Sequence, residues 1–171
     1  MARKITEIIL HCSATKEGQN YKASDIDRWH KNQGWKCIGY NYVIDLDGTV
    51  EKGRDIDDIP AHCTGHNKNS IGICYIGGCD ANNKAKDTRT QQQKVSMYKL
   101  VKELMVKYKI DITSVHCHNE YASKACPSYS ISTFRAEFSE WLSGKPKEEP
   151  KKKVKCPHCG MEIDTNILNN I

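Results

Sequence analysis

Hydrophobic residues that alternate with polar ones, or that follow one another in short runs, predict several strands along the chain. These stretches lie at residues 5–10, 39–54, 70–78 and 111–118. The first ends at His11. The second predicts a hairpin with a two-residue turn at Asp47-Gly48, and Tyr40 and Tyr42 are expected on one face of it. The third is closed by glycines and predicts a buried strand.

Apolar residues that recur at intervals of three and four positions predict three helices. The first begins at Ser24, with Asp27 placed to complete a capping box, and ends at Gly34. The second is long and is capped by Thr90. The third is amphipathic and ends at Gly144. The predicted helices therefore alternate with the predicted strands.

Because strands and helices interleave, the expected fold class is α/β, with a mixed central β-sheet flanked by helices. Residues 55–70 show no periodicity and are expected to form a loop. After residue 144 the composition changes to Lys, Glu and Pro. We therefore expect one compact domain over residues 1–144, a charged linker over residues 145–155 and a small tail over residues 156–171.

The net charge of +5 is concentrated after the expected domain. Residues 145–155 contain six Lys and two Glu, whereas residues 1–144 are nearly balanced, so the charge gives no reason to expect a nucleic-acid partner. No apolar run reaches the roughly 18 residues of a membrane span. The N-terminal segment is a poor secretory signal, and we expect a cytoplasmic protein without its own signal peptide.

Nine cysteines cannot all pair, and free thiols and metal ligands are favoured over a disulfide framework. In the tail, Cys156 and Cys159 of "CPHCG" match one half of a zinc ribbon and are candidates for a second metal site. Three interpretations stay open: a truncated half ribbon, a zinc clip that joins two chains, and a redox-active thiol pair. We expect a monomer, with a tail-mediated dimer as the alternative.

Candidate catalytic residues lie where predicted strands end and in the loop that follows. His11, His118 and Cys126 offer two imidazoles and one thiolate, a donor set that suits Zn²⁺. Three protein ligands leave a fourth position for water, which is the pattern of catalytic zinc sites. Lys124 is placed to stabilise the negative oxygen of a tetrahedral intermediate. Tyr40 offers a phenol that could position or deprotonate the water.

Four motifs carry a resemblance to a known family. They are "HCSAT" (11–15), "GYNYVIDLDGTVEKGRD" (39–55), "AHCTGHNKNSIGIC" (61–74) and "HNEYASKACPS" (118–128). Together they closely resemble the zinc-dependent N-acetylmuramoyl-L-alanine amidases, nearest the phage lysozyme-type branch, which shares its fold with the peptidoglycan recognition proteins. The resemblance implies a groove that holds one Zn²⁺ ion. It also implies hydrolysis of the amide bond between N-acetylmuramic acid and L-alanine in peptidoglycan.

The resemblance also implies roles for single residues. His11, His118 and Cys126 match the zinc ligands of the family. Tyr40 matches the family tyrosine near the attacking water, and Lys124 matches the transition-state lysine. Many recognition proteins on this fold have lost the cysteine ligand, so the presence of all five residues favours catalysis.

Three histidines outside this set need separate interpretation. From spacing alone, His116 competes with His118 as a ligand, and counting back from "KAC" selects His118. Asn119 stands where the family often has a second histidine. His62 matches a groove-lining position in related sequences, so contact with the glycan–peptide substrate is expected. Its neighbour His66 is expected to be a solvated loop residue.

Two functions stay open at this point. The leading hypothesis is a cell-wall amidase of a phage, prophage or bacterium. The alternative is a non-catalytic module that binds peptidoglycan without cutting it. An enzyme without an export signal fits release to the wall through a separate membrane pore, and it also fits the breakdown of wall fragments in the cytoplasm.

Overall fold

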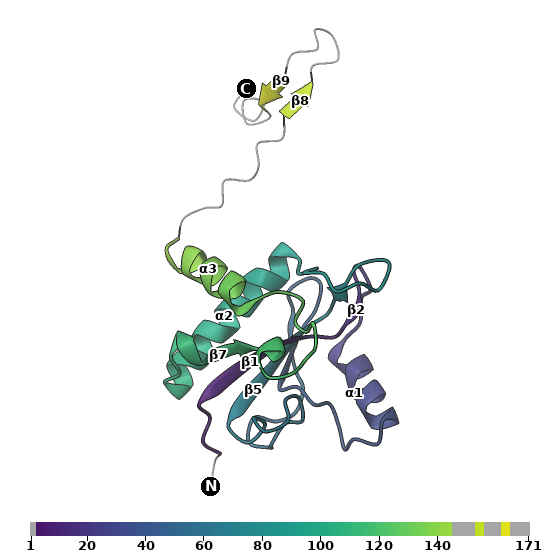
Figure 1. The fold of residues 1–171 in the computed structure, drawn as a ribbon, viewed down its shortest axis with the longest axis vertical. Coiled ribbons are helices and arrows are strands. Elements are labelled where there is room, and N and C mark those ends of the chain that lie inside the picture. Colours follow the sequence, from purple (N-terminus) through teal and green to yellow (C-terminus); the bar gives the residue numbers. More distant parts are fainter. Residues whose placement is uncertain (1–2, 145–152, 156–161, 165–171) are drawn as a thin grey trace. The chain divides into compact units, whose positions relative to one another are not determined.

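The computed structural model describes residues 3–144, 153–155 and 162–164 (Figure 1). In chain order its elements are β1 (Glu7–Cys12), β2 (Thr15–Lys16), α1 (Ala23–Asn32), β3 (Tyr42–Ile44), β4 (Val50–Lys52), β5 (Ser70–Tyr75), β6 (Gly78–Cys79), α2 (Gln91–Tyr108), the 3-10 helix η1 (Ile112–Ser114), β7 (Val115–Cys117), the 3-10 helix η2 (His118–Glu120), α3 (Ile131–Leu142), β8 (Lys153–Lys155) and β9 (Glu162–Asp164). The chain divides into two compact units, Met1–Phe138 and Ser139–Ile171. Among the described residues, no helix has the length and apolar character that a membrane span requires.

The first unit contains a five-stranded sheet in the order β4-β3-β5-β1-β7. The strand pairs β3–β5, β5–β1 and β1–β7 are parallel, and β4 pairs antiparallel with β3. The expected α/β fold with a mixed central sheet is therefore confirmed. β5 is buried along its whole length, as the unbroken apolar run at residues 70–78 predicts for a central strand.

Helices cover both faces of this sheet (Figure 1). Ile26 of α1 packs in one cluster with Val43 of β3 and Cys74 of β5. On the other face, the Gln93 side chain of α2 donates hydrogen bonds to the carbonyls of Ile44 (3.1 Å) and Ile76 (2.9 Å). The sheet is thus enclosed between helices, and its exposed functional groups can lie only at the strand ends and in the loops.

The predicted cap of α2 is confirmed, whereas that of α1 is wrong by two residues. Thr90 Oγ1 accepts the N–H of Gln93 (3.0 Å), and the Gln93 side chain accepts the N–H of Thr90 (2.9 Å). α1 instead begins after Lys22, whose N–H donates to the Asp25 carboxylate (3.0 Å). Asp27 is drawn away from the cap because its carboxylate accepts the N–H of Ile38 (2.8 Å).

The hairpin differs from its prediction at the turn. The N–H of Asp45 donates to the carbonyl of Thr49 (2.9 Å), so residues 46–48 form the loop between them. Gly48 has a φ of +85°, a left-handed conformation that glycine adopts without strain. The predicted two-residue turn is therefore wrong by one residue, although the glycine that ends it is in place.

Tyr40 and Tyr42 do not share a face, which corrects a second prediction for the hairpin. Tyr40 packs against the core beneath α1, whereas Tyr42 lies toward α2. Asn41 separates the two rings because its N–H donates to the Gly72 carbonyl and its side-chain oxygen accepts the Gly72 N–H, both at 3.0 Å. These two hydrogen bonds of Asn41 lie just before β3 begins. The Tyr40 ring lies beside His11, with ring centroids 5.1 Å apart.

The segment without periodicity behaves as expected, since no strand or helix lies between β4 and β5. In the second unit, β8 pairs antiparallel with β9. The predicted tail ligands Cys156 and Cys159 lie outside the described residues, as does most of the predicted linker.

Candidate active site

Three side chains from distant parts of the chain meet at one edge of the sheet. One ligand atom from each of His11, His118 and Cys126 lies within 4.8 Å of the others. His11 Nδ1 lies 3.7 Å from Cys126 Sγ. A nitrogen and a sulfur bound to one tetrahedral Zn²⁺ ion would lie about 3.6 Å apart, given typical Zn–N and Zn–S bond lengths. The donor set and its spacing therefore fit a single metal ion.

The topology explains why the two histidines meet. β1 and β7 run parallel side by side, so their carboxyl ends carry His11 and His118 to the same edge. His118 is the first residue of η2, directly after β7. Cys126 comes from the loop before α3, where its Sγ accepts the N–H of Cys12 (3.3 Å). Two candidate ligands are thus placed by the sheet and the third by a loop.

Both imidazoles are held in the neutral form that binds metal ions. Burial lowers the pKa of His11 well below its usual value, and electrostatic repulsion by His62, His118 and Lys124 against a protonated His11 lowers it further. Burial also lowers the pKa of His118, followed by the effect of the Lys124 ammonium group. A neutral imidazole offers a lone pair to a cation without first losing a proton, so the site can bind a divalent ion near neutral pH.

Two thiols lie together at this site. The hydrogen bond with the Cys126 side chain lowers the pKa of Cys12 to about 7. The same bond, followed by burial, raises the pKa of Cys126. The pair therefore loses one proton readily and keeps the second. A bound cation would draw the negative charge to Cys126, because it is Cys126 that groups with the two histidines.

Tyr40 and Lys124 lie beside the metal-ligand group. Burial raises the pKa of Tyr40 well above its usual value, so the phenol keeps its proton and can act as a hydrogen-bond donor. Lys124 is exposed and lines a cavity of about 410 Å³ that His118 also borders. The cavity gives a substrate access to the ligand group from the side on which the lysine lies.

His62 lies against His11 in the interior. Its Nδ1 is 2.9 Å from His11 Nε2, and its Nε2 is 3.1 Å from the hydroxyl of Ser70. His62 is 9% exposed, and it borders the same cavity as Lys124. Burial lowers the pKa of His62 to about 3, so the ring is neutral. Because the protein itself engages both ring nitrogens, the predicted contact of His62 with substrate stays a prediction.

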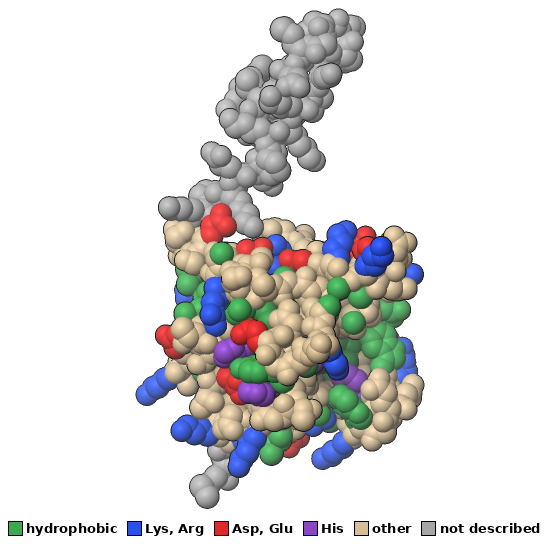
Figure 2. Space-filling model, viewed as in Figure 1, with side chains coloured by type: hydrophobic (Ala, Val, Ile, Leu, Met, Phe, Trp, Pro, Cys, Tyr) green, Lys and Arg blue, Asp and Glu red, His purple; other side chains and the backbone are tan. Residues whose placement is uncertain are grey.

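His116 takes no part in the ligand group, and His66 is not simply solvated. His116 Nδ1 lies 3.1 Å from a carboxylate oxygen of Glu120. His66 Nδ1 lies 3.1 Å from the Glu7 carboxylate, and its ring stacks on Tyr121 with centroids 3.8 Å apart. Figure 2 shows histidine and acidic side chains close together on one face of the protein. The two contacts of His66 connect the loop before β5 to β1 and to the residue that follows η2.

Other residues near the cavity were not expected from the sequence. His30 of α1 accepts the N–H of Gly39 at Nδ1 (3.0 Å) and stacks on Trp35. Trp35 is 39% exposed and lines the cavity. A tryptophan directly after the predicted helix-ending Gly34 was the available signal in the sequence. Asn67 holds its loop, because its side-chain oxygen accepts the N–H of His62 (2.9 Å).

Comparison with known proteins identifies the family. The family model described as N-acetylmuramoyl-L-alanine amidase matches residues 1–129, a range that contains all three grouped ligands. The chain belongs to this family. It is therefore an amidase, and the family activity is directed at peptidoglycan.

The relatives of this amidase include both enzymes and recognition proteins. An endolysin of Escherichia phage T7 is 44% identical over 124 residues, which cover 72% of this chain and 81% of the endolysin. Peptidoglycan-recognition protein SC2 of Drosophila melanogaster is 30% identical over 77% of this chain and 69% of its own length. Among solved structures, the amidase LysC from Clostridium intestinale URNW matches with a TM-score of 0.68 and 29% identity, covering 80% of this chain and 87% of LysC.

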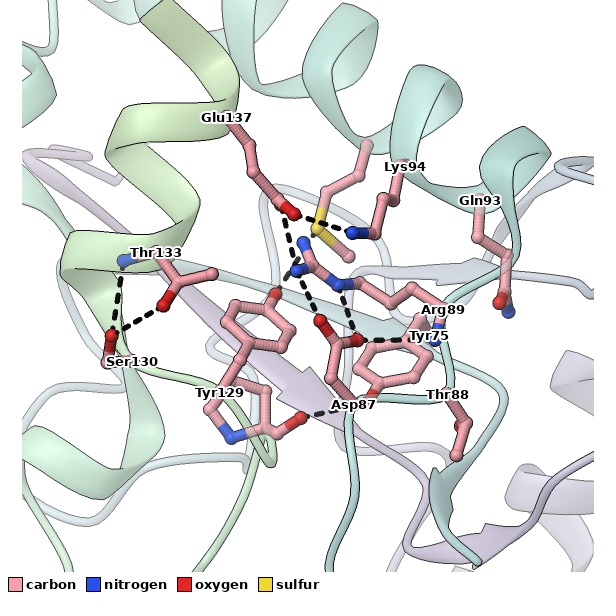
Figure 3. Close-up of polar contacts among 12 residues, drawn as sticks. Tyr75, Asp87, Thr88, Arg89, Gln93, Lys94, Tyr129, Ser130, Thr133 and Glu137 are labelled. Atoms are coloured by element: carbon pink, nitrogen blue, oxygen red, sulfur yellow. Dashed lines mark hydrogen bonds and ion pairs between the residues drawn. The ribbon is translucent and has the colours of Figure 1, made fainter. Parts of the chain in front are cut away.

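A buried polar cluster supports the loop of the amidase that carries Cys126 (Figure 3). The hydroxyl of Tyr75 on β5 donates to the carbonyl of Pro127, the residue after Cys126 (2.8 Å). The guanidinium carbon of Arg89 lies 3.6 Å from the centre of the Tyr129 ring. Both contacts tie the loop to parts of the chain that are themselves buried, so the position of Cys126 does not depend on the loop alone.

Arg89 is in turn held by two carboxylates. Its guanidinium group lies 2.8 Å from Asp87 and 2.9 Å from Glu137 of α3. Glu137 also accepts hydrogen bonds from Lys94 and Tyr98 of α2. The cluster therefore joins α2, α3 and the Cys126 loop (Figure 3). The Arg89 side chain is fully buried, which makes each of its partners important for stability.

The ligand assignment predicts different results for two neighbouring histidines. His118→Ala should abolish stoichiometric zinc binding because it removes one of three ligands. His116→Ala should leave it intact because His116 contacts Glu120 instead. The metal content of both purified variants, measured by atomic emission after dialysis against zinc, checks the prediction. Zinc retained by His118→Ala and lost by His116→Ala would reverse the assignment.

The buried cluster predicts a large loss of stability on replacement of Arg89. Arg89→Met removes the positive charge that pairs with the carboxylates of Asp87 and Glu137. The free energy of unfolding should therefore fall by about 3 kcal/mol. Urea denaturation monitored by circular dichroism measures it. Lys86→Met is the matched control, since it breaks only the exposed ion pair with Glu17 and should change little. Equal stability of both variants would contradict the importance of the cluster.

Proposed function

We propose that this amidase depends on Zn²⁺ and cleaves the amide bond between N-acetylmuramic acid and L-alanine in peptidoglycan. The observation that carries the proposal is the grouping of His11, His118 and Cys126 within 4.8 Å at the edge of a cavity. Three donors of these types leave room for a fourth ligand, which distinguishes catalytic from structural zinc sites. The two lowered histidine pKa values support metal binding at neutral pH.

When bound there, Zn²⁺ would supply Lewis-acid chemistry, which polarises a carbonyl and lowers the pKa of water. The cavity that His118 borders admits the substrate, and Trp35 and Tyr121 lie on its walls. These aromatic rings offer flat apolar surface to a sugar ring or a peptide stem. The role of the cavity is to present the scissile carbonyl to the three ligands and to Lys124.

Lys124 and Tyr40 act on different parts of the reaction. The Lys124 ammonium group bears a positive charge next to the ligands, where it stabilises the negative oxygen that develops on the attacked carbonyl. The protonated Tyr40 phenol lies next to His11, where it orients the attacking water by hydrogen bonding. The raised pKa of Tyr40 favours this orienting role over that of a general base.

A recognition module that binds peptidoglycan without cutting it is the second candidate function. The favourable observation is the 30% identity with a peptidoglycan-recognition protein. Binding of peptidoglycan requires only the residues that line the cavity, however. It does not require that the buried His11 side chain face Cys126. The presence of Lys124 and Cys126 together favours hydrolysis.

We further propose that this amidase acts as an endolysin does, on the cell wall after its release from the cytoplasm. The proposal is supported by the T7 relative, which is described as an endolysin and of which this chain covers 81%. Breakdown of soluble wall fragments in the cytoplasm is the alternative. Comparison of intact sacculi with purified muropeptides as substrates distinguishes the two.

Digestion of purified peptidoglycan tests the reaction and its metal dependence together. Mass spectrometry of the products should show glycan strands that lack peptides and stem peptides with a free L-alanine amino group. A chelator should stop the digestion, and added Zn²⁺ should restore it, because the three ligands hold the ion reversibly. Cleavage of glycosidic bonds, or cleavage that persists in the metal-free protein, would refute the proposal.

The role of Lys124 predicts a loss of rate without a loss of metal. Lys124→Ala removes one donor to the developing oxyanion, and turnover should fall by about 10²–10³. Zinc content should stay at the level of the unmodified protein, since Lys124 is no ligand. Lys99→Ala on the exposed side of α2 is the control for the loss of one lysine charge. Turnover of Lys124→Ala equal to that of the control would exclude Lys124 from the reaction.

A further inference from the structure

His11, His62 and Ser70 form a continuous buried row. His11 Nε2 lies 2.9 Å from His62 Nδ1, and His62 Nε2 lies 3.1 Å from Ser70 Oγ. His11 and Ser70 are fully buried, and His62 is 9% exposed. The three residues come from β1, from the loop before β5 and from β5 itself. Water does not replace these partners easily, so each contact determines where the protons lie.

The position of the His62 ring is fixed from two sides. The N–H groups of His62 and of the next residue both donate to Asn67 Oδ1 at 2.9 Å, which holds the loop. The ring lies directly on Gly72, where an added Cβ would come within 2.5 Å of the His62 ring. Gly72 therefore provides the space that the ring occupies. The fold accommodates this ring in one place, beside His11.

The distribution of protons along the row decides whether His11 can bind a cation. If His11 donates from Nε2 to His62 Nδ1, its Nδ1 lone pair faces Cys126 Sγ at 3.7 Å and is free for a metal ion. His62 must then donate from Nε2 to Ser70. In the opposite arrangement His62 donates to His11, and His11 carries a proton on Nδ1 in the place of the metal. The two arrangements are mutually exclusive for neutral rings.

We propose that His62 is a positioning residue for His11, which fixes the tautomer and the orientation in which Nδ1 faces Cys126 and His118. The proposal rests on the proposed metal-dependent function and adds a residue that acts through a ligand. Partners of this kind normally accept the free ring N–H of a ligating histidine, and their loss weakens metal binding. His62 thus serves the metal site from the interior, in addition to any contact with substrate.

The affinity for Zn²⁺ tests the proposal. His62→Leu removes the acceptor, and the dissociation constant, measured by competition with a chromophoric chelator, should rise by about 10–100-fold. In His62→Asn the amide oxygen can take the place of Nδ1, so most of the affinity should return. His66→Leu is the matched control in the same loop, because His66 contacts Glu7 outside the row, and its affinity should equal that of the unmodified protein. If His62 only contacted substrate, His62→Leu would raise KM and leave zinc affinity unchanged, which would overturn the proposal.

A measurement on the unmodified zinc-loaded protein does not depend on the folding of any variant. Nitrogen-15 NMR of the histidine rings reports which nitrogen of His62 bears the proton. The proposal requires the proton on Nε2, and a proton on Nδ1 would overturn it because His62 could then accept nothing from His11. Failure of the unmodified protein to bind zinc or to cleave peptidoglycan would instead refute the proposed function.

Discussion

The active site of this amidase depends on one buried imidazole with two different neighbours. His11 is fully buried in the inner strand β1, so both of its nitrogens need partners within the protein. His62 lies next to one nitrogen, and Cys126 Sγ lies 3.7 Å from the other. The first contact has the length of a hydrogen bond, whereas the second has the separation expected for two ligands of one cation. The fold of the sheet and the proposed metal site therefore use the same residue.

The remaining parts of the site differ in how firmly the backbone holds them. His11 and His118 end neighbouring parallel strands, and the hydrogen bonds of the sheet set the distance between them. Cys126 and Lys124 lie in a loop, where no such ladder exists. The contacts of Tyr75 with Pro127 and of Arg89 with Tyr129 take its place. Removal of one partner from a buried ionic cluster is costly, but the intact cluster stabilises the fold little more than apolar packing would, so its value here lies in the position that it gives to the loop.

Much of the fold was predictable from the sequence, because local patterns report local structure. The apolar run before His11 correctly predicted strand β1. The capping box of Thr90 and Gln93 correctly predicted the start of α2. The grouping of His11, His118 and Cys126 was expected from strand ends and motif resemblance. The start of α1 was predicted wrongly because the spacing of Ser24 and Asp27 in the sequence matches a capping box. The competing hydrogen bond of Asp27 with the N–H of Ile38 forms only in the folded chain.

The contact of His62 with His11 shows where prediction from local patterns ends. It joins residues 51 positions apart, and one of them lies in a loop without periodicity. The same holds for Asn41, whose bond to Gly72 turns Tyr40 toward the site. Such contacts leave no periodic trace in the sequence, since they depend on two segments that meet only after the sheet has formed.

The burial of these groups bears on the choice between hydrolysis and simple recognition. A surface that only binds a glycan or a peptide acts through exposed side chains, such as Trp35 at the cavity. Neutral imidazoles and a second thiol in the interior add nothing to that surface, and their burial is unfavourable unless their polar atoms are satisfied. A cation between His11, His118 and Cys126 would satisfy the imidazole nitrogen of His11 and the sulfur of Cys126. The interior of the site therefore fits the proposed binding of a metal ion, and recognition at the groove alone does not account for it.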